Sequence, residues 1–193
     1  MDLIMKDRLI KYTLKNHQKI KDFVLNEIDN FNGGGILPGD DESSVYKTDY
    51  FTQMEKSSRQ IEKYFSFFEE NARDFYDFIL DYYYTPSIKI DNYWFQQYIK
   101  NDAHVWHVHP FASISYVYYV ELEDSSLATE FFDIRTKKTF RPDVQEGDII
   151  IFDSYIPHRS PKVLYDTRKT IISSNLNFNL CLDVERIENE LSQ

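Results

Sequence analysis

The sequence predicts an α+β fold in which helices from the first part of the chain support an antiparallel β-sandwich or barrel. Apolar residues recur at helical spacing in residues 5–31 and 53–83. From about residue 87, short runs rich in β-branched and aromatic residues alternate with turn-like stretches. Because short strands in series follow a helical start, we expect the helices to pack against the strands.

The helical part is predicted to span residues 1–85. Residues 5–31 fit one or two amphipathic helices, and residues 53–83 fit one long helix that ends before Pro86. The aromatic stripe of the long helix is predicted to be core packing. Between these helices, residues 32–44 hold four of the five glycines, which indicates a loop that serves as a linker or a lid.

The strand-rich part is predicted to span residues 86–180, followed by a tail over 181–193. At 193 residues, the whole chain is expected to form a single domain. The predicted strands are residues 88–99, 113–122, 129–134, 148–153 and 168–180.

The composition argues against several classes of protein. A net charge of −10 disfavours a broad phosphate-binding surface, so no nucleic-acid partner is expected. The single cysteine, Cys181, excludes an intrachain disulfide and a cysteine-based zinc site. We see neither a signal-peptide core nor 18 consecutive apolar residues, so no membrane association and a cytoplasmic location are expected.

A cluster of histidines is the candidate metal site. In the stretch HVWHVHP, over residues 104–110, strand geometry would direct His107 and His109 to the same face. Two such imidazoles can bind one ion, and His158, just after the strand 148–153, is the candidate third ligand. His104 is expected to be a loop residue. An isolated His-x-His pair is also typical of surface histidines, but Arg168 adds a candidate anion site nearby.

With these segments in view, the chain resembles the Fe(II)- and 2-oxoglutarate-dependent oxygenases, most closely the compact type common in phages and bacteria. The resemblance covers roughly residues 85–179 and rests on an ordered set of soft motifs, which are NYWFQQYIKNDAHVWHVHP, SISYVYYV, EGDIIIFDSYIPHRSP and RKTIISSNLNF. It implies that residues 86–180 form a double-stranded β-helix, a jelly-roll barrel with the metal at its open end.

The resemblance also implies cofactors and residue roles. Fe(II), the cosubstrate 2-oxoglutarate and O2 would take part, and the usual result is hydroxylation of a small molecule, peptide or protein. His107 matches the first iron ligand and His158 the distal one. The residues that match cosubstrate-binding positions are Arg168, which would bind the far carboxylate, and its helpers Thr170, Tyr119 and Tyr98.

The sequence departs from the usual pattern at His109, where most of these oxygenases have Asp or Glu. Either His109 completes a three-histidine site, which we favour, or a carboxylate from another strand does; the candidates are Asp133, Glu130 and Asp153. Two other functions therefore stay open. One is a three-histidine cupin-type metalloenzyme that needs no 2-oxoglutarate, and the other is a non-catalytic jelly-roll binding protein.

Overall fold

The computed structural model describes residues 9–31, 35–36, 43–50, 63–178 and 184–192. Every pairing between the described strands is antiparallel. The larger sheet has the order β1 (Leu9–Thr13), β10 (Asp148–Asp153), β7 (Ile114–Leu122), β12 (Lys169–Phe178), β5 (Ile88–Tyr98) and β4 (Lys47–Thr48). The smaller sheet has the order β6 (His104–His107), β11 (His158–Ser160), β8 (Glu130–Asp133) and β9 (Lys138–Phe140). A short hairpin pairs β2 (Gly35–Ile36) with β3 (Ser44–Val45).

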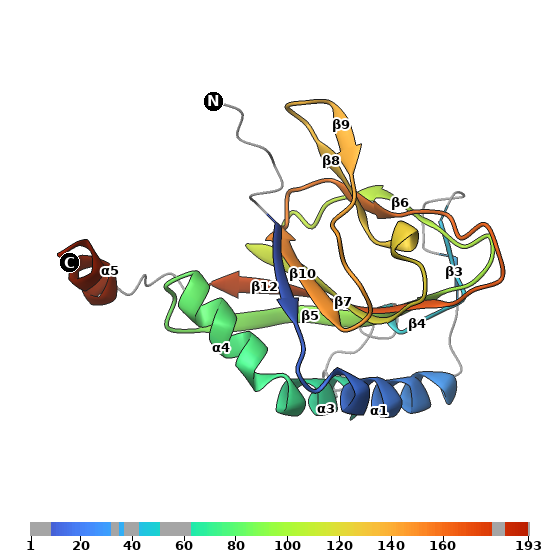
Figure 1. Ribbon diagram of the computed structural model, residues 1–193, viewed down its shortest axis with the longest axis horizontal. Coiled ribbons are helices and arrows are strands. Elements are labelled where there is room, and N and C mark those ends of the chain that lie inside the picture. The colour runs from blue at the N-terminus through green and yellow to red at the C-terminus, as the bar shows by residue number, and fades with distance from the viewer. Residues whose placement is uncertain (1–8, 32–34, 37–42, 51–62, 179–183, 193) are drawn as a thin grey trace.

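Helices cover one face of the larger sheet, and the smaller sheet lies over the other (Figure 1). The covering helices are α1 (His17–Asp29), α3 (Lys63–Asn71) and α4 (Arg73–Tyr82). Their apolar faces bury residues such as Val24, Phe68 and Ile79 against the sheet. The expected packing of helices against strands is confirmed, and so is the role of the aromatic stripe in the core for its described residues, apart from Tyr82, which is half exposed.

Both faces of the larger sheet are buried, as the alternation along β7 and β10 makes clear. Tyr116 and Tyr118 pack in the core under the helices, whereas Val117 and Tyr119 pack in a second core between the sheets. In β10, Ile149 and Ile151 belong to the first core, and Ile150 and Phe152 belong to the second. This arrangement follows from the two-residue period of a strand and explains why these segments read as nearly continuous apolar runs.

Several elements differ from the sequence prediction. Residues 9–13 form β1 rather than part of a helix, because LIKYT pairs along the edge of β10. The predicted long helix is two helices, with Ala72 between them, and residues 51–62 lie outside the described part. The predicted loop over 32–44 also lies mostly outside it, apart from β2 and the start of β3. The predicted tail contains α5 (Val184–Leu191).

The described part of the chain thus has an α+β fold built on antiparallel sheets, as predicted. Closure of the two sheets into a barrel stays a prediction. Among the described helices, none combines the length and apolar character needed to cross a bilayer.

Candidate metal centre

Pairing between two strands brings His107 and His158 together. His107 ends β6, His158 begins β11, and the antiparallel register places the two residues directly opposite each other. Their ring centroids lie 4.3 Å apart. Strand pairing between distant segments therefore forms the first half of the site.

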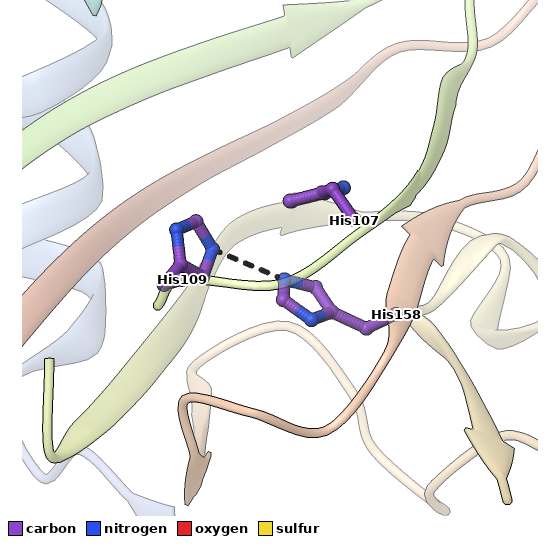
Figure 2. Close-up of side chains that lie close together, drawn as sticks. All are labelled: His107, His109 and His158. Carbon is purple, nitrogen blue, oxygen red and sulfur yellow. Dashed lines mark hydrogen bonds between the residues drawn. The ribbon is translucent and has the colours of Figure 1, made fainter. Parts of the chain in front are cut away.

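His109 completes the cluster from the segment that follows β6. Its backbone N–H donates to the carbonyl oxygen of Ser154 at 2.9 Å, which holds this segment beside the end of β10. Its Nε2 atom lies 3.3 Å from Nε2 of His158 (Figure 2). One ring nitrogen from each of His107, His109 and His158 lies within 4.8 Å of the others.

Hydrogen bonds to backbone carbonyls orient two of the rings. His107 Nδ1 lies 2.8 Å from the carbonyl oxygen of Val105, and His158 Nδ1 lies 2.9 Å from that of Ile156. Because a carbonyl can only accept, each Nδ1 carries the proton and each Nε2 keeps its lone pair. Outer hydrogen bonds of this kind fix the tautomer of metal-binding histidines in many proteins.

The site is uncharged and made of nitrogen donors. Burial, followed by the neighbouring imidazoles, lowers the pKa of His109 to about 3 and that of His158 well below the usual value. Burial also lowers the pKa of His107. Neutral imidazoles suit ions such as Fe(II), Zn(II) and Ni(II). The 3.3 Å between the Nε2 atoms of His109 and His158 is short enough for both to bind one ion through bonds of about 2.1 Å.

None of the carboxylates that were considered as ligands joins this cluster within the described residues. Glu130 accepts from Arg159 Nε at 2.6 Å and also pairs with Arg141. Asp133 accepts the backbone N–H groups of Arg135 and Thr136 in the turn after β8. The geometry therefore favours the three-histidine alternative, although His109 follows β6 and does not share a strand with His107 as we had predicted.

A pocket lies against the three histidines and is lined from both sheets. Trp94, Gln96 and Tyr98 line it from β5, and Ile171, Ser173 and Asn175 line it from β12. His104 also lines it, with its ring stacked on that of His107 at a centroid distance of 4.0 Å. The prediction that His104 is a loop residue is wrong, since it begins β6.

Comparison with known proteins identifies the fold. No family model matches the sequence, and no curated protein matches it. Solved structures do match. A Pseudomonas putida prolyl-4-hydroxylase is 8% identical over 89% of this chain and 93% of that one, with a TM-score of 0.58. A viral collagen prolyl hydroxylase from Paramecium bursaria Chlorella virus-1, in complex with 2-oxoglutarate, is 11% identical over 89% and 96%, with a TM-score of 0.56.

HygX from Streptomyces hygroscopicus, with nickel and 2-oxoglutarate bound, is 8% identical over 90% of this chain and 84% of that one, with a TM-score of 0.63. The chain has the fold of the Fe(II)/2-oxoglutarate oxygenases. The resemblance to these oxygenases that the sequence motifs indicated is therefore confirmed at the level of the fold.

Within this oxygenase fold, Arg168 and Thr170 face the helices and not the pocket. Arg168 donates to both carboxylate oxygens of Glu121, at 2.9 and 2.7 Å, and also pairs with Asp29 at the end of α1. Thr170 donates to Glu121 and accepts from Gln97. Neither residue lines the pocket. The role of carboxylate anchor that the resemblance implied for Arg168 and Thr170 does not fit this position, since both side chains are held by Glu121.

The neighbouring Lys169 points to the other face of β12 and was missed in the sequence. Its side chain is fully buried, its Nζ donates to the Leu127 carbonyl at 2.9 Å and to Ser160 Oγ, and it lies 4.5 Å from the Tyr98 ring centroid. Lys169 does not line the pocket itself, but Ser160 and Tyr98, which it contacts, both do. Burial lowers the pKa of Lys169 to about 7.

Tyr119 and Tyr98, the two tyrosines that match cosubstrate-binding positions, differ in their surroundings. Tyr119 packs in the core between the sheets, and its hydroxyl accepts the backbone N–H of Thr129 at 3.1 Å. Tyr98 lines the pocket, and its buried hydroxyl makes no hydrogen bond of ordinary geometry within the described residues. Ser160, which accepts from Lys169, also interacts with the Tyr98 hydroxyl, so Tyr98 and Lys169 share one polar neighbour at the pocket.

Proposed function

We propose that the chain is an Fe(II)- and 2-oxoglutarate-dependent oxygenase that uses O2 to hydroxylate a small molecule, peptide or protein. The observation that carries this proposal is a three-histidine cluster in a pocket that is also lined by Ser160 and Tyr98, two residues in contact with the buried Lys169, in a chain with the oxygenase fold. Three of its structural neighbours are two prolyl hydroxylases and an enzyme with nickel and 2-oxoglutarate bound.

His107, His109 and His158 would hold the iron through their Nε2 atoms. Three ligands on one side of an ion leave positions for a bidentate cosubstrate and for O2. Bound Fe(II) and 2-oxoglutarate supply the oxidising chemistry, in which the cosubstrate is decarboxylated to succinate. An imidazole in place of the usual carboxylate leaves the centre one unit more positive, and this favours an anionic cosubstrate.

Lys169 would anchor the far carboxylate of 2-oxoglutarate in place of Arg168. A buried ammonium group needs an anionic or strongly polar partner, and the described contacts of Lys169 Nζ are the two neutral oxygens of Leu127 and Ser160. A carboxylate at this position would restore a charge pair away from solvent. The hydroxyl of Tyr98, whose ring centroid lies 4.5 Å from Lys169 Nζ, would supply a second donor.

The remaining pocket residues would orient the substrate and exclude water. Trp94 and Ile171 give the pocket an apolar wall, while Gln96, Ser173 and Thr129 add polar groups. Pockets of this composition select ligands through shape, with a few polar contacts that fix orientation.

Anaerobic titration tests the proposal directly. Apoprotein is loaded with Fe(II) and then titrated with 2-oxoglutarate, and bidentate chelation of the cosubstrate should produce a weak charge-transfer band in the visible region. Slow formation of succinate on exposure to air should follow, even without substrate. Tight binding of Fe(II) with neither a band nor succinate would contradict the oxygenase proposal.

A second candidate is a three-histidine cupin-type metalloenzyme that needs no 2-oxoglutarate. The observation that favours it is that no carboxylate joins the cluster among the described residues. Substitution Lys169→Met distinguishes the two. In an oxygenase it should weaken 2-oxoglutarate binding, whereas a cupin-type enzyme would bind no 2-oxoglutarate to begin with.

A further inference from the structure

Among the described residues, the Nδ1 atom of the third histidine faces a side chain, where a backbone carbonyl orients each of the other two. His107 and His158 each have a carbonyl oxygen within 2.9 Å of Nδ1, but Nδ1 of His109 faces the side-chain amide of Asn175 at 3.5 Å. Asn175 is buried and lies on β12, on the pocket side of the larger sheet. A side chain therefore takes the place that a backbone group takes at the other two ligands.

Two buried serines continue from this amide. Ser115 Oγ donates to Asn175 Oδ1 at 2.7 Å and lies 2.8 Å from Ser154 Oγ. Ser154 also accepts the backbone N–H of His109 through its carbonyl oxygen. His109 is thus held at its backbone and at its ring by one connected group of residues, and Ser154 belongs to both contacts.

The polarity of this chain of hydrogen bonds depends on whether His109 binds a metal. In the arrangement observed, Asn175 Nδ2 faces His109 Nδ1, which suits a ring whose Nδ1 is an acceptor. A His109 that gives its Nε2 lone pair to a metal must carry its proton on Nδ1. Two N–H donors would then face each other, unless the amide turns and presents its oxygen.

The serine pair permits that turn at no loss of hydrogen bonds. With the amide reversed, Asn175 Nδ2 would donate to Ser115 Oγ, and the Ser115 hydroxyl would donate to Ser154 Oγ instead, 2.8 Å away. A hydroxyl both donates and accepts, so the number of hydrogen bonds is the same in either arrangement, and only the Ser154 O–H gives up its acceptor. A backbone carbonyl at the same place would allow only one polarity.

We propose that Asn175 is the positioning residue for the third ligand, and that its amide turns when metal binds so that Oδ1 accepts from His109 Nδ1–H. Ser115 and Ser154 take up the reversed polarity. The inference rests on the proposed three-histidine site and adds a role for residues that lie outside the ligand set.

Titration with Co(II) alone, followed by its visible spectrum, measures the role of Asn175. Asn175→Leu keeps a similar volume but removes the acceptor, so Co(II) affinity should fall about 10- to 100-fold, the usual range for such outer partners. Asn175→Asp supplies an acceptor and should hold wild-type affinity or exceed it. Asn177→Leu is the matched control, since Asn177 lies two residues along β12 and bonds to Ser113 instead; it should bind Co(II) like wild type.

Nitrogen-15 NMR of the wild-type chain loaded with Zn(II) provides a second measurement that needs no variant. The His109 ring should show a protonated Nδ1 and a metal-bound Nε2. Any one of three results would overturn this inference and leave the metal site standing. These are wild-type Co(II) affinity in Asn175→Leu, equal losses of affinity in both Asn175 variants, and an unprotonated Nδ1 on His109. Absence of Co(II) binding by the wild-type chain would instead overturn the metal site itself, and this inference with it.

Discussion

His109 Nε2 lies 3.3 Å from His158 Nε2, although the two residues are 49 positions apart in the chain. The register between β6 and β11 and the bond from His109 N–H to Ser154 fix this distance. Both constraints are contacts within the fold, so strand pairing and one backbone hydrogen bond account for the arrangement of the two ligands. A fold that holds its ligands in this way lowers the free-energy cost of ordering them when metal binds.

Removal of either paired histidine should abolish tight metal binding. In His107→Ala or His158→Ala, two imidazoles remain, and Co(II) or Fe(II) affinity should fall by at least about 100-fold. Isothermal titration calorimetry on the anaerobic protein measures this loss. His17→Ala is the control, because His17 bonds to Tyr118 and Glu146 under the helices, and it should bind metal normally. Equal affinity in wild type and His158→Ala would contradict the site.

The adjacent cations Arg168 and Lys169, at the point where β12 begins, should differ in their effect on 2-oxoglutarate binding. Lys169→Met removes the buried ammonium group, and the dissociation constant of 2-oxoglutarate for the Fe(II)-loaded protein should rise about 10- to 100-fold, as expected for a hydrogen bond to a charged group. Arg168→Met should leave it unchanged, since Glu121 holds that guanidinium on the other face. Anaerobic titration of the charge-transfer band measures both. A larger effect of Arg168→Met than of Lys169→Met would instead support Arg168 as the carboxylate anchor that the resemblance implied.

The difference between Arg168 and Lys169 shows where sequence reasoning reached its limit. The strand that follows Arg168 is buried on both faces, so Ile171 and Ile172 are both apolar. The alternation of residues along this strand therefore does not show in the sequence which face Arg168, Lys169 or Thr170 occupies. A slip of one residue reverses the face of every side chain. The two faces became distinct only when the helices and the smaller sheet covered them.

The histidines were found from the sequence because their residue type carries the chemistry. Their arrangement was less readable. His109 was assigned to a strand, but β6 ends at His107, and a backbone bond to Ser154 aims His109 at the site instead. Strand β1 was missed since its five residues, LIKYT, precede a true helix and also fit its spacing. Tertiary pairing with β10 decides its conformation.

The core beneath the helices should control stability without touching the metal site. Phe68 is fully buried, with its ring 5.3 Å from that of Tyr118, so Phe68→Ala should cost about 3–5 kcal/mol of the free energy of unfolding. Phe111, 90% exposed, is the matched control, and Phe111→Ala should change stability by less than about 0.5 kcal/mol. Guanidinium denaturation measures both values. A loss in Phe68→Ala no larger than in the control would contradict this packing.

The contribution of Lys169 to stability should rise with pH above neutrality. Burial lowers the pKa of Lys169 to about 7 in the folded chain, whereas in the unfolded chain the group titrates near its model value of 10.5. Between these two values the unfolded chain binds one more proton than the folded chain, so the folded state gains stability as pH increases. For one proton, the unfolding equilibrium constant should fall by up to about tenfold per pH unit over this window.

Urea denaturation of the metal-free chain between about pH 7 and 8.5 measures this dependence, below the range in which tyrosines ionise in the unfolded chain. Lys169→Met removes the titrating group, so its stability should rise less steeply with pH than that of wild type. Lys100→Met is the control, since Lys100 is half exposed and pairs with Asp166 at the surface. Its slope should equal that of wild type. Parallel slopes in wild type and Lys169→Met would mean that Lys169 keeps its charge in the fold, which requires an anion beside it even without 2-oxoglutarate.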